Sequence, residues 1–443
     1  MNIIIGMVLA LGVIILVHEW GHFIAARFFG VRVDVFSIGF GPRLFGIKRG
    51  ATDWRISAIP LGGYVRMAGQ DITEVDSGEA VPTGAADELM SKKRWQRAVI
   101  SAAGPVVNLI FPVLLLTGYF ILAGKPHFAY LDLPPVVTNM APGSTAATAG
   151  FLPGDKIISV NGTKSPTWEI AQTALESGPA SQPVKIEVEN NGTTRNLALA
   201  LKTDPYDHPL GYLPMVPVIG QVIPGKPAAH AGLQAGDIVR SVDGQKIEYW
   251  DQFVDLVRGS GGKTLQVQVE RKGQPVAVSV TPRKGAADPS EKNYQIGIGP
   301  EVALVYRPIG PVRAAKFAAM QTGGTIMDTF GVIGKLFSGR VSVKELHSVV
   351  GISRAAGEAV SMGAFFIVSF MCLISVNLGI LNLLPIPILD GGHILLLSLE
   401  GVRRRDFSMA FKERFIQVGL VFLLVLFAYV MYNDVARQLP VHL

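Results

Sequence analysis

The chain has 443 residues, of which 49% are hydrophobic and only 17% are charged, and its formal net charge is +6. It is too apolar for an ordinary soluble protein, and its charged central region excludes a chain that lies wholly in a membrane. The basic residues cluster beside apolar segments rather than along a soluble face, which argues against a nucleic-acid partner. Cys372 is the only cysteine, so the sequence offers neither an intramolecular disulfide nor a cysteine-based metal site.

The first apolar segment covers residues 3–26, and residues 3–17 carry no charge. It is long enough to cross a hydrocarbon core of about 30 Å. Because no basic residue precedes the apolar run, we expect a retained span rather than a cleaved signal peptide.

This segment contains His18-Glu19-x-x-His22. Residues four apart share one face of a helix, so the two imidazoles can bind one Zn²⁺ while Glu19 acts as a base. Sites of this kind keep one position for water and lower its pKa to about 7, which makes hydrolysis the natural chemistry. The alternative is a chance match, but ionisable residues in a spanning helix are costly unless they bind something.

Glycine-rich, alternating stretches follow at residues 37–41 and 59–67. They predict a β-hairpin. At membrane depth such a hairpin must be covered by protein, and its edge can pair with an extended substrate. An ordinary cytoplasmic hairpin is the alternative.

The second apolar segment, residues 98–123, contains Gly104-Pro-Val-Val-Asn108 near its start. Small residues let helices approach closely, and an asparagine can hydrogen-bond to a neighbouring helix. We expect this motif to serve helix packing.

Residues 149–162 and 231–244 repeat one pattern without a gap, at an offset of 82 residues, and Trp168 and Trp250 are related by the same offset. Each copy has a small-residue helix start, a Gly-Asp turn, a β-branched strand ending in Asn-Gly or Asp-Gly, and a later alternating strand. The repeat predicts two copies of one α+β domain.

The AGFLPGD and AGLQAGD blocks, with the VNG and VDG that follow them, resemble PDZ domains. PDZ domains bind extended peptides, often C-termini, by adding them as a strand to a sheet edge. By this resemblance the carboxylate-binding loops would be residues 210–214 and 296–300, each preceding a strand, so peptide C-termini are expected partners. The alternative is that the copies are spacers that block access by size.

Residues 312–362 alternate apolar and basic positions with glycine breaks. This pattern predicts amphipathic helices that lie on the membrane surface.

A third apolar segment, residues 364–384, runs into Asn382-x-x-Pro385-x-Pro-x-x-Asp390-Gly-Gly-His393. The prolines break the helix, and a carboxylate appears in apolar surroundings. Asp390 would complete a site of two histidines and one carboxylate, with water in the fourth position. His393 is the rival ligand, although an interfacial or hydrogen-bonding role is its simpler interpretation.

A fourth apolar segment, residues 415–432, places both termini on one side of the membrane. Lys and Arg concentrate between the first two segments and between the last two, which predicts that both loops are cytoplasmic. The repeated domains and the termini would then be periplasmic, with the chain in a bacterial inner membrane.

H-E-x-x-H in the first span and N-x-x-P-x-x-x-x-D-G in a later one resemble the paired signature of the site-2 proteases, the intramembrane zinc metalloproteases. The resemblance covers nearly the whole chain. It implies that His18, His22 and Asp390 bind zinc, that Glu19 is the general base, and that Asn382 donates to the substrate carbonyl or oxyanion. Expected substrate-binding residues are Gly62, Gly63, Tyr64, Val65, Arg66 and Pro385.

The resemblance also implies a substrate class, a single-span membrane protein such as an anti-sigma factor after a first cleavage, or a remnant signal peptide, with the PDZ pair excluding substrates by size. An inactive membrane-tethered PDZ adaptor or chaperone is an alternative, but it would have kept Glu19, both histidines and Asp390 by accident. A transporter predicts internal symmetry between spans, which the sequence lacks.

The expected fold is a multi-pass α-helical membrane protein with four transmembrane helices, a membrane-re-entrant β-hairpin and two extracytoplasmic α+β PDZ domains. The expected boundaries are a first span at 1–27, a cytoplasmic loop with the hairpin at 28–97, a second span at 98–124, PDZ domains at 128–215 and 216–303, amphipathic helices at 304–362, a third span at 363–392, a cytoplasmic loop at 393–414, a fourth span at 415–433 and a periplasmic tail at 434–443.

Overall fold

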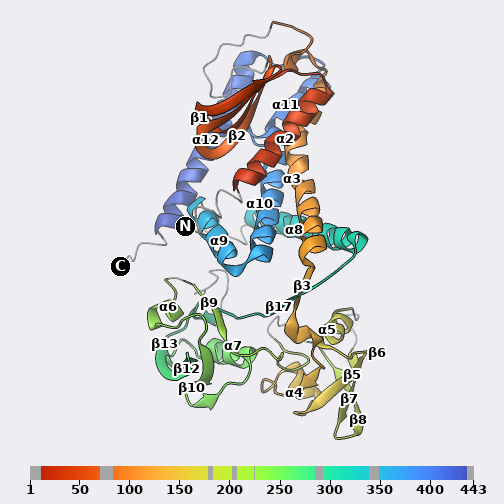
Figure 1. Cartoon of the computed structure of the whole chain (residues 1–443), viewed down its shortest axis with the longest axis vertical. Helices are drawn as coiled ribbons and strands as arrows, with labels where there is room; N and C mark the ends of the chain where they lie inside the picture. Colours follow the sequence, from red (N-terminus) through yellow and green to blue (C-terminus); the bar gives the residue numbers. More distant parts are fainter. Residues whose placement is uncertain are drawn as a thin grey trace. The chain divides into compact units, whose positions relative to one another are not determined.

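The computed structural model of the chain describes residues 11–69, 83–177, 183–201, 207–223, 225–284, 293–338 and 349–436. The chain divides into two compact units (Figure 1). The helical unit comprises Met1–Lys125 and Pro308–Leu443, and the repeat unit comprises Pro126–Arg307.

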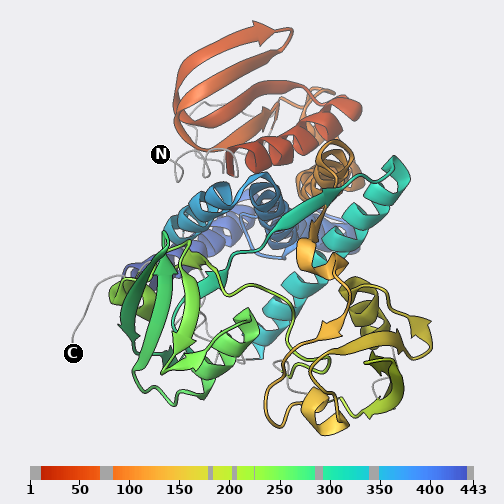
Figure 2. The ribbon, with the colours of Figure 1, turned by 60° about the horizontal axis from the view of Figure 1, so that its bottom comes forward.

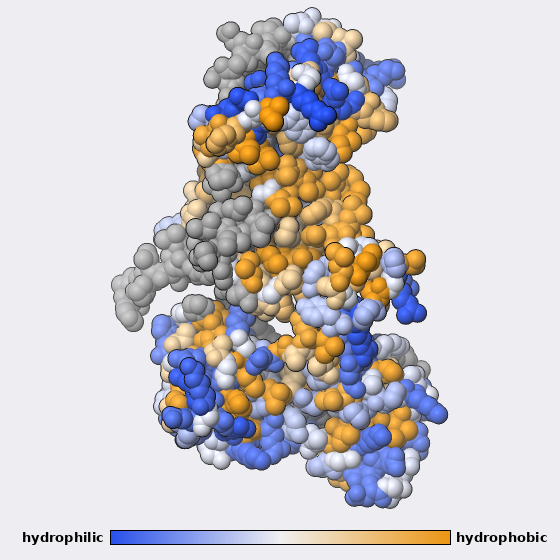
Figure 3. All heavy atoms as spheres, in the orientation of Figure 1, coloured by the Kyte–Doolittle hydropathy of each residue, from blue (hydrophilic) through white to orange (hydrophobic). Residues whose placement is uncertain are grey.

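The helical unit is built from long apolar helices, and hydrophobic residues cover much of its surface (Figure 3). Three of these helices are long and apolar enough to cross a membrane, at Arg94–Ala123, Ala364–Leu383 and Ala410–Tyr432, close to the predicted second, third and fourth spans. Part of the predicted first span lies outside the described residues, so that span stays a prediction. The helices described here are α2 (Val13–Phe28), α3 (Arg94–Ala123), α8 (Pro311–Phe337), α9 (Val349–Met362), α10 (Ala364–Leu383), α11 (Asp390–Arg403) and α12 (Met409–Ala436), together with a short 3-10 turn, η2 (Leu89–Ser91).

Glycines bring α2 and α10 close to α3. A Cβ on Gly21 of α2 would lie 2.6 Å from the carbonyl oxygen of Ala103, and a Cβ on Gly379 of α10 would lie 3.0 Å from that of Pro105. In apolar surroundings helices associate mainly through van der Waals contact, which small residues improve. The three helices therefore form one closely packed group around the middle of α3.

The predicted surface helices are present as helices. Ala314 and Ala318 of α8 are buried against Leu116 and Phe120 of α3. Other apolar side chains of α8 are exposed, including Met327, which is 72% exposed. An exposed apolar face suits contact with lipid, which remains a prediction here.

The predicted hairpin forms a small sheet from β1 (Val33–Arg49) and β2 (Thr52–Met67), beside α2 (Figure 2). Both strands bend, so Ile38 in β1 lies next to Gly63 on one side and Ile56 on the other. Residues 62–67 therefore form an edge of the sheet, and among the described residues no further strand pairs with it. Alternate residues of β2 face the core, where Val65 and Met67 are buried.

The repeat unit contains the two predicted copies, each with its own sheet and core. In the first copy the sheet order is β4-β5-β7-β8, with β6 beside β5, and in the second it is β11-β10-β12-β13. The first copy comprises β4 (Val136–Val137), α4 (Thr145–Ala149), β5 (Asp155–Val160), β6 (Thr163–Lys164), α5 (Trp168–Glu176), β7 (Val184–Asn190) and β8 (Thr193–Leu199). The second comprises β9 (Ile219–Val222), α6 (Pro227–Ala231), β10 (Ile238–Val242), β11 (Gln245–Lys246), α7 (Trp250–Gly259), β12 (Leu265–Arg271), β13 (Gln274–Val280), β14 (Arg283–Lys284), β15 (Tyr294–Gln295) and β16 (Ile298–Pro300).

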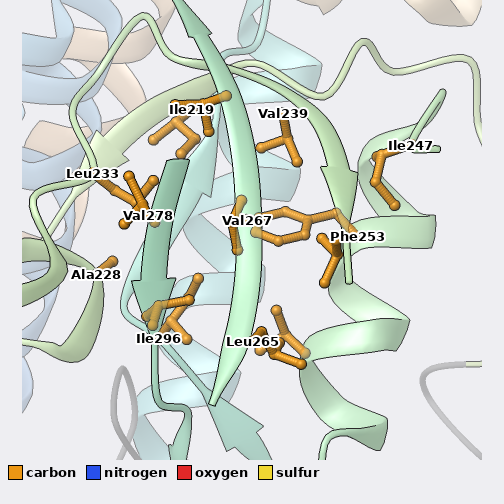
Figure 4. Packing of buried hydrophobic residues seen from close by; sticks show 14 of the residues in the cluster. Ile219, Ala228, Leu233, Val239, Ile247, Phe253, Leu265, Val267, Val278 and Ile296 are labelled. Atoms are coloured by element: carbon orange, nitrogen blue, oxygen red, sulfur yellow. The ribbon is translucent and has the colours of Figure 1, made fainter. Parts of the chain in front are cut away.

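Branched aliphatic residues from both sheet and helix fill each core, as Figure 4 shows for the second copy around Val267 and Phe253. Burying one such side chain contributes about 1.5–3 kcal/mol. The repeated tryptophans, Trp168 and Trp250, are 0% and 5% exposed. The common offset in the sequence therefore reflects a common core position.

The repeated Gly-Asp turn also has one structural role in both copies. Asp155 and Asp237 have fully buried side chains, and each pairs with an arginine, Arg195 or Arg271. A buried carboxylate needs such a partner because burial of an unpaired charge is costly. The aspartate of each turn thus forms an ion pair, with a buried carboxylate and a partly exposed arginine, that connects one end of β5 or β10 to a later strand.

The segments that lead into and out of the repeat unit pair with each other, as β3 (Lys125–Phe128) and β17 (Leu304–Arg307), and the 3-10 turn η3 (Ala129–Asp132) follows β3. His127 Nε2 lies 2.7 Å from Asp132 Oδ1, and Arg307 contacts Asp132 and lies 3.6 Å from Glu169. The Arg307 guanidinium already supplies the positive charge for both carboxylates. We therefore interpret this group as an ion network and not as a metal site.

Two predicted connecting segments can be compared with the structure. Residues 393–414, predicted as a cytoplasmic loop, include the rest of helix α11 and the start of α12, and their side of the membrane stays a prediction. Residues 210–214 form no strand, whereas residues 296–300 include β16. The backbone N–H of Leu213 instead donates to Asp251 on α7 of the second copy at 3.2 Å.

Candidate active site

Helix α2 presents both histidines of the H-E-x-x-H motif on one face. The Nε2 atoms of His18 and His22 lie 3.2 Å apart, and the side chains are only 7% and 8% exposed. Their spacing of four residues produces this arrangement because one helical turn takes 3.6 residues.

Asp390, which is distant in the sequence, completes the cluster. Its Oδ2 lies 3.2 Å from His18 Nε2 and its Oδ1 lies 3.4 Å from His22 Nε2. The three side chains form a group whose ligand atoms all lie within 4.8 Å of one another. His393, the rival ligand, lies one turn further along α11 and does not belong to this group.

A tightly folded break between α10 and α11 sets the position of Asp390. Ile388 has φ +77°, a left-handed conformation that is strained for a β-branched residue. Cβ atoms on Gly391 and Gly392 would lie 2.2 Å and 2.3 Å from the carbonyl oxygens of Leu384 and Ile386. Only glycine fits at these two positions, so the Asp-Gly-Gly sequence packs the start of α11 against the broken segment.

One face of α3 contacts the histidines and orients their rings. His22 Nδ1 donates a hydrogen bond to the carbonyl oxygen of Ile100 at 2.8 Å. A Cβ on Gly104 would lie 2.3 Å from His22 Nε2 and 2.7 Å from its Cε1. Gly104 therefore leaves room for the imidazole, a role that the sequence analysis missed by assigning this motif to packing alone.

The cluster fits a divalent metal ion. Two imidazole nitrogens and one carboxylate converge in a buried space, which matches the ligand set of zinc hydrolases that keep an open position. A carbonyl oxygen only accepts hydrogen bonds, so the bond to Ile100 keeps the proton on Nδ1 of His22 and the lone pair on Nε2. That lone pair faces Asp390 and His18, where a cation would lie.

Glu19 lies between the histidines and the small sheet. A Cβ on Gly63 would lie 3.5 Å from Glu19 Cγ and 3.6 Å from Ile15. The edge of β2 thus runs beside the carboxylate that the motif predicts as a base. An extended chain paired to this edge would pass close to Glu19.

The other predicted substrate-binding residues of β2 differ in how far their side chains are buried. Val65 is 5% exposed because its side chain packs in the core, so at this position the backbone is the part that can pair with an extended chain. Tyr64 stacks on Phe40, with ring centroids 6.0 Å apart, and contacts Arg55. Arg66 is half-buried, and the backbone of residues 62–67 lies along the free edge of the sheet, so the predicted substrate role of this segment stays a prediction.

Asn382 and Pro385 lie at the helix break itself. Asn382 is on the last turn of α10, half-buried, and Pro385 is in the turn that follows. Within the described parts of the chain, no hydrogen bond connects Asn382 with the histidines or Asp390. Its predicted role toward a substrate carbonyl stays a prediction.

The comparisons with known proteins agree with this geometry. The family model described as Peptidase family M50 matches residues 6–426. The chain belongs to this family. It is 36% identical to "Regulator of sigma-E protease RseP" of Escherichia coli (strain K12), over 97% of each chain.

Two further relatives carry names that include the metal. "Putative zinc metalloprotease NMA0084" of Neisseria meningitidis is 34% identical over 99% of this chain and 100% of the relative. "Putative zinc metalloprotease" of Vibrio cholerae is 32% identical over 98% of each. Together with the three-residue cluster, family membership confirms the prediction of a metalloprotease, and the predicted zinc agrees with these names.

Proposed function

We propose that this chain is a zinc-dependent intramembrane protease of the site-2 class, which hydrolyses a peptide bond within the membrane-spanning segment of a single-span protein. The observation that carries the proposal is the buried cluster of His18, His22 and Asp390 beside Glu19, in a unit of long apolar helices. A peptidase site at this position has access to segments that are themselves in the membrane.

Each residue has a definite part in this chemistry. His18, His22 and Asp390 would hold zinc, which lowers the pKa of a water that it binds. Glu19 would take a proton from the attacking water and deliver it to the leaving amide nitrogen. Asn382 would donate a hydrogen bond to the substrate carbonyl as negative charge develops on its oxygen.

The substrate would bind as an extended strand on the edge formed by residues 62–67. A helical segment hides its peptide bonds in internal hydrogen bonds, so it must unfold locally before water can attack. Pairing with a sheet edge replaces the lost backbone hydrogen bonds, which are obligatory in lipid. The short distance between Gly63 and Glu19 would then bring a bond of the bound strand to the base.

The surroundings that we propose are the inner membrane of a bacterium. The chain would cross it four times, with residues 28–97 and 393–414 in the cytoplasm and the repeat unit in the periplasm. As the resemblance to the site-2 proteases implies, the substrate would be an anti-sigma factor after a first cleavage, and remnant signal peptides would be a second class.

The two copies in the repeat unit would act as PDZ domains. The second copy has a cavity of about 180 Å³ between α7 and residues 294–300, lined by Trp250, Phe253 and Val257 among others. A groove between a helix and a strand is where PDZ domains take extended peptides. In the first copy the corresponding segment, residues 210–214, is engaged by α7, so we assign peptide binding to the second copy.

Cleavage by the purified protein in detergent tests the proposal. A single-span model substrate would be cut by the wild type, while Glu19→Gln and chelated samples would be inactive and zinc would restore the chelated sample. Glu413→Gln is the matched control, since Glu413 is an exposed glutamate on α12. An uncut substrate in the zinc-loaded wild type, with several substrates that lack external domains, would favour the adaptor alternative.

We also propose that the PDZ pair excludes substrates by size. Grafting a folded domain onto the periplasmic end of the model substrate would then abolish cleavage by the full chain. Equal cleavage of the grafted and ungrafted substrates would refute the size filter and leave the protease assignment intact.

A further inference from the structure

We infer that Asn108 is a positioning residue that accepts a hydrogen bond from Nδ1–H of His18 and so directs the lone pair of His18 Nε2 toward the metal. This inference rests on the proposed function. It extends the site to a residue of the second predicted span that the metal does not touch.

The geometry places the Asn108 amide against the imidazole. Asn108 is 0% exposed, and its Nδ2 lies 3.2 Å from His18 Nδ1. Its Oδ1 is also buried and has no hydrogen-bond partner. The two ends of an amide are interchanged by a half-turn about the Cβ–Cγ bond, so either end can face the histidine.

Only one of the two orientations is compatible with metal binding through Nε2. If Nδ2 donates to His18 Nδ1, the proton of the neutral imidazole must lie on Nε2, where it blocks coordination. If Oδ1 faces Nδ1 instead, it accepts the proton of Nδ1–H, and Nε2 keeps its lone pair. In this orientation Oδ1, and not Nδ2, is the end of the Asn108 amide that meets the imidazole.

His22, the second histidine of the motif, also has its Nδ1 atom hydrogen-bonded to α3. His22 Nδ1 donates to the Ile100 carbonyl oxygen at 2.8 Å, and this oxygen cannot act as a donor. Ile100, Gly104 and Asn108 follow one another at intervals of four along one face of α3. That face therefore determines which nitrogen of each neutral imidazole carries the proton, and Gly104 leaves room for the His22 ring.

The backbone at Asn108 is also held in place from a neighbouring helix. Its carbonyl oxygen would normally accept from the N–H four residues later, but that residue is Pro112, which has none. Ser375 on α10 supplies the missing donor, with its Oγ 2.8 Å from the Asn108 oxygen. Ser375 is 0% exposed, so this bond lies in the interior and fixes Asn108 relative to α10.

The test measures the metal affinity of the purified full-length protein in detergent, by competition between the protein and a chelator of known zinc affinity. Loss of a partner to a metal-binding histidine typically weakens metal binding about 10- to 100-fold. We expect that loss for Asn108→Leu, which has similar volume but no acceptor. Asn108→Asp keeps an acceptor, so it should bind zinc within a few-fold of the wild type.

A matched control is Asn377→Leu. Asn377 is on α10 and accepts from Thr329 Oγ1 at 2.8 Å, and it is not part of the cluster. It should retain the affinity of the wild type. The absorption spectrum of the Co²⁺-loaded protein gives a second reading, because a misplaced imidazole changes the ligand field while looser helix packing elsewhere does not.

Wild-type zinc affinity in Asn108→Leu would overturn the inference, and so would an equal loss in Asn108→Asp and Asn108→Leu, since that pattern indicates packing alone. If Asn108→Leu does not elute as a folded protein, Asn108→Ala removes the same acceptor with less volume and is judged by the same criterion. Failure of the proposed function is a separate outcome, because it appears as absent zinc binding or absent cleavage in the wild type.

Discussion

Replacing Gly104 with alanine would test how tightly α3 encloses the metal site. The added Cβ would lie 2.3 Å, 2.7 Å and 2.8 Å from Nε2, Cε1 and Cδ2 of His22. Ordinary contacts between such atoms are about 3.5–4.0 Å. The ring would therefore have to move by about 1 Å, or α2 would have to separate from α3.

Separation of the helices would break the close packing of Gly21 of α2 against the Ala103 carbonyl. The displacement should fall mainly on the His22 ring. A misplacement of about 1 Å at a catalytic site costs about 100-fold in rate. We expect Gly104→Ala to lose at least that factor in cleavage of the model substrate, together with weaker zinc binding.

Gly118→Ala is the matched control because it is the same change on the same helix, at a position where a Cβ would meet no atom within 4 Å. It should cleave at the wild-type rate. Both variants would be compared by initial rates at saturating zinc and by chelator competition. Wild-type zinc affinity and rate in Gly104→Ala would refute the reasoning that this glycine makes room for the ligand.

Two further predictions concern the repeat unit. Asp237→Asn should destabilise the second copy by about 2 kcal/mol, because it removes the charge of a buried carboxylate that accepts hydrogen bonds from the partly exposed Arg271 guanidinium. Hydrogen exchange of the full chain should show this loss in the second copy only, and equal exchange in wild type and variant would contradict it. The pKa of His208 is raised, since burial opposes its charge but Asp255 and Asp251 outweigh that effect. Because the pKa is raised in the folded chain, the stabilising contact between His208 and α7 is fully present below the ordinary histidine pKa of about 6.5. The contact is lost as the pH rises through the pKa that His208 has in the folded chain. Exchange of α7, corrected for intrinsic rates, should therefore increase as the pH rises above about 6.5 in the wild type. His208→Gln should lose this dependence, and a parallel response in both proteins would refute the assignment.

Much of the site could be predicted from local spacing. The H-E-x-x-H motif places His18 and His22 on one face whenever that segment is helical, so their convergence needs no tertiary information. The repeat at an offset of 82 likewise predicted two similar cores, because the same residues recur at buried positions. Asp390 was preferred to His393 from chemistry alone, and the structure brings Asp390 to both histidines.

Other parts could not be read from the sequence. Val65 sits in a strand that was expected to face substrate, but alternation along β2 turns its side chain into the core. The first copy of the repeat was expected to resemble the second, yet residues 210–214 bind the neighbouring α7. Both outcomes depend on which surfaces meet after folding, and a motif does not contain that information.

The sequence by itself determined the chemistry of this protein, because two histidines and a glutamate at helical spacing, with a distant carboxylate in apolar surroundings, leave few other uses for these groups. The tertiary structure decided how that chemistry is held. It placed Ile100, Gly104 and Asn108 of α3 against the imidazoles and the edge of β2 beside Glu19. The physical reason is that coordination requires groups distant in sequence to meet within a few ångströms, and only the packing of α2, α3, α10, α11 and the small sheet brings them together.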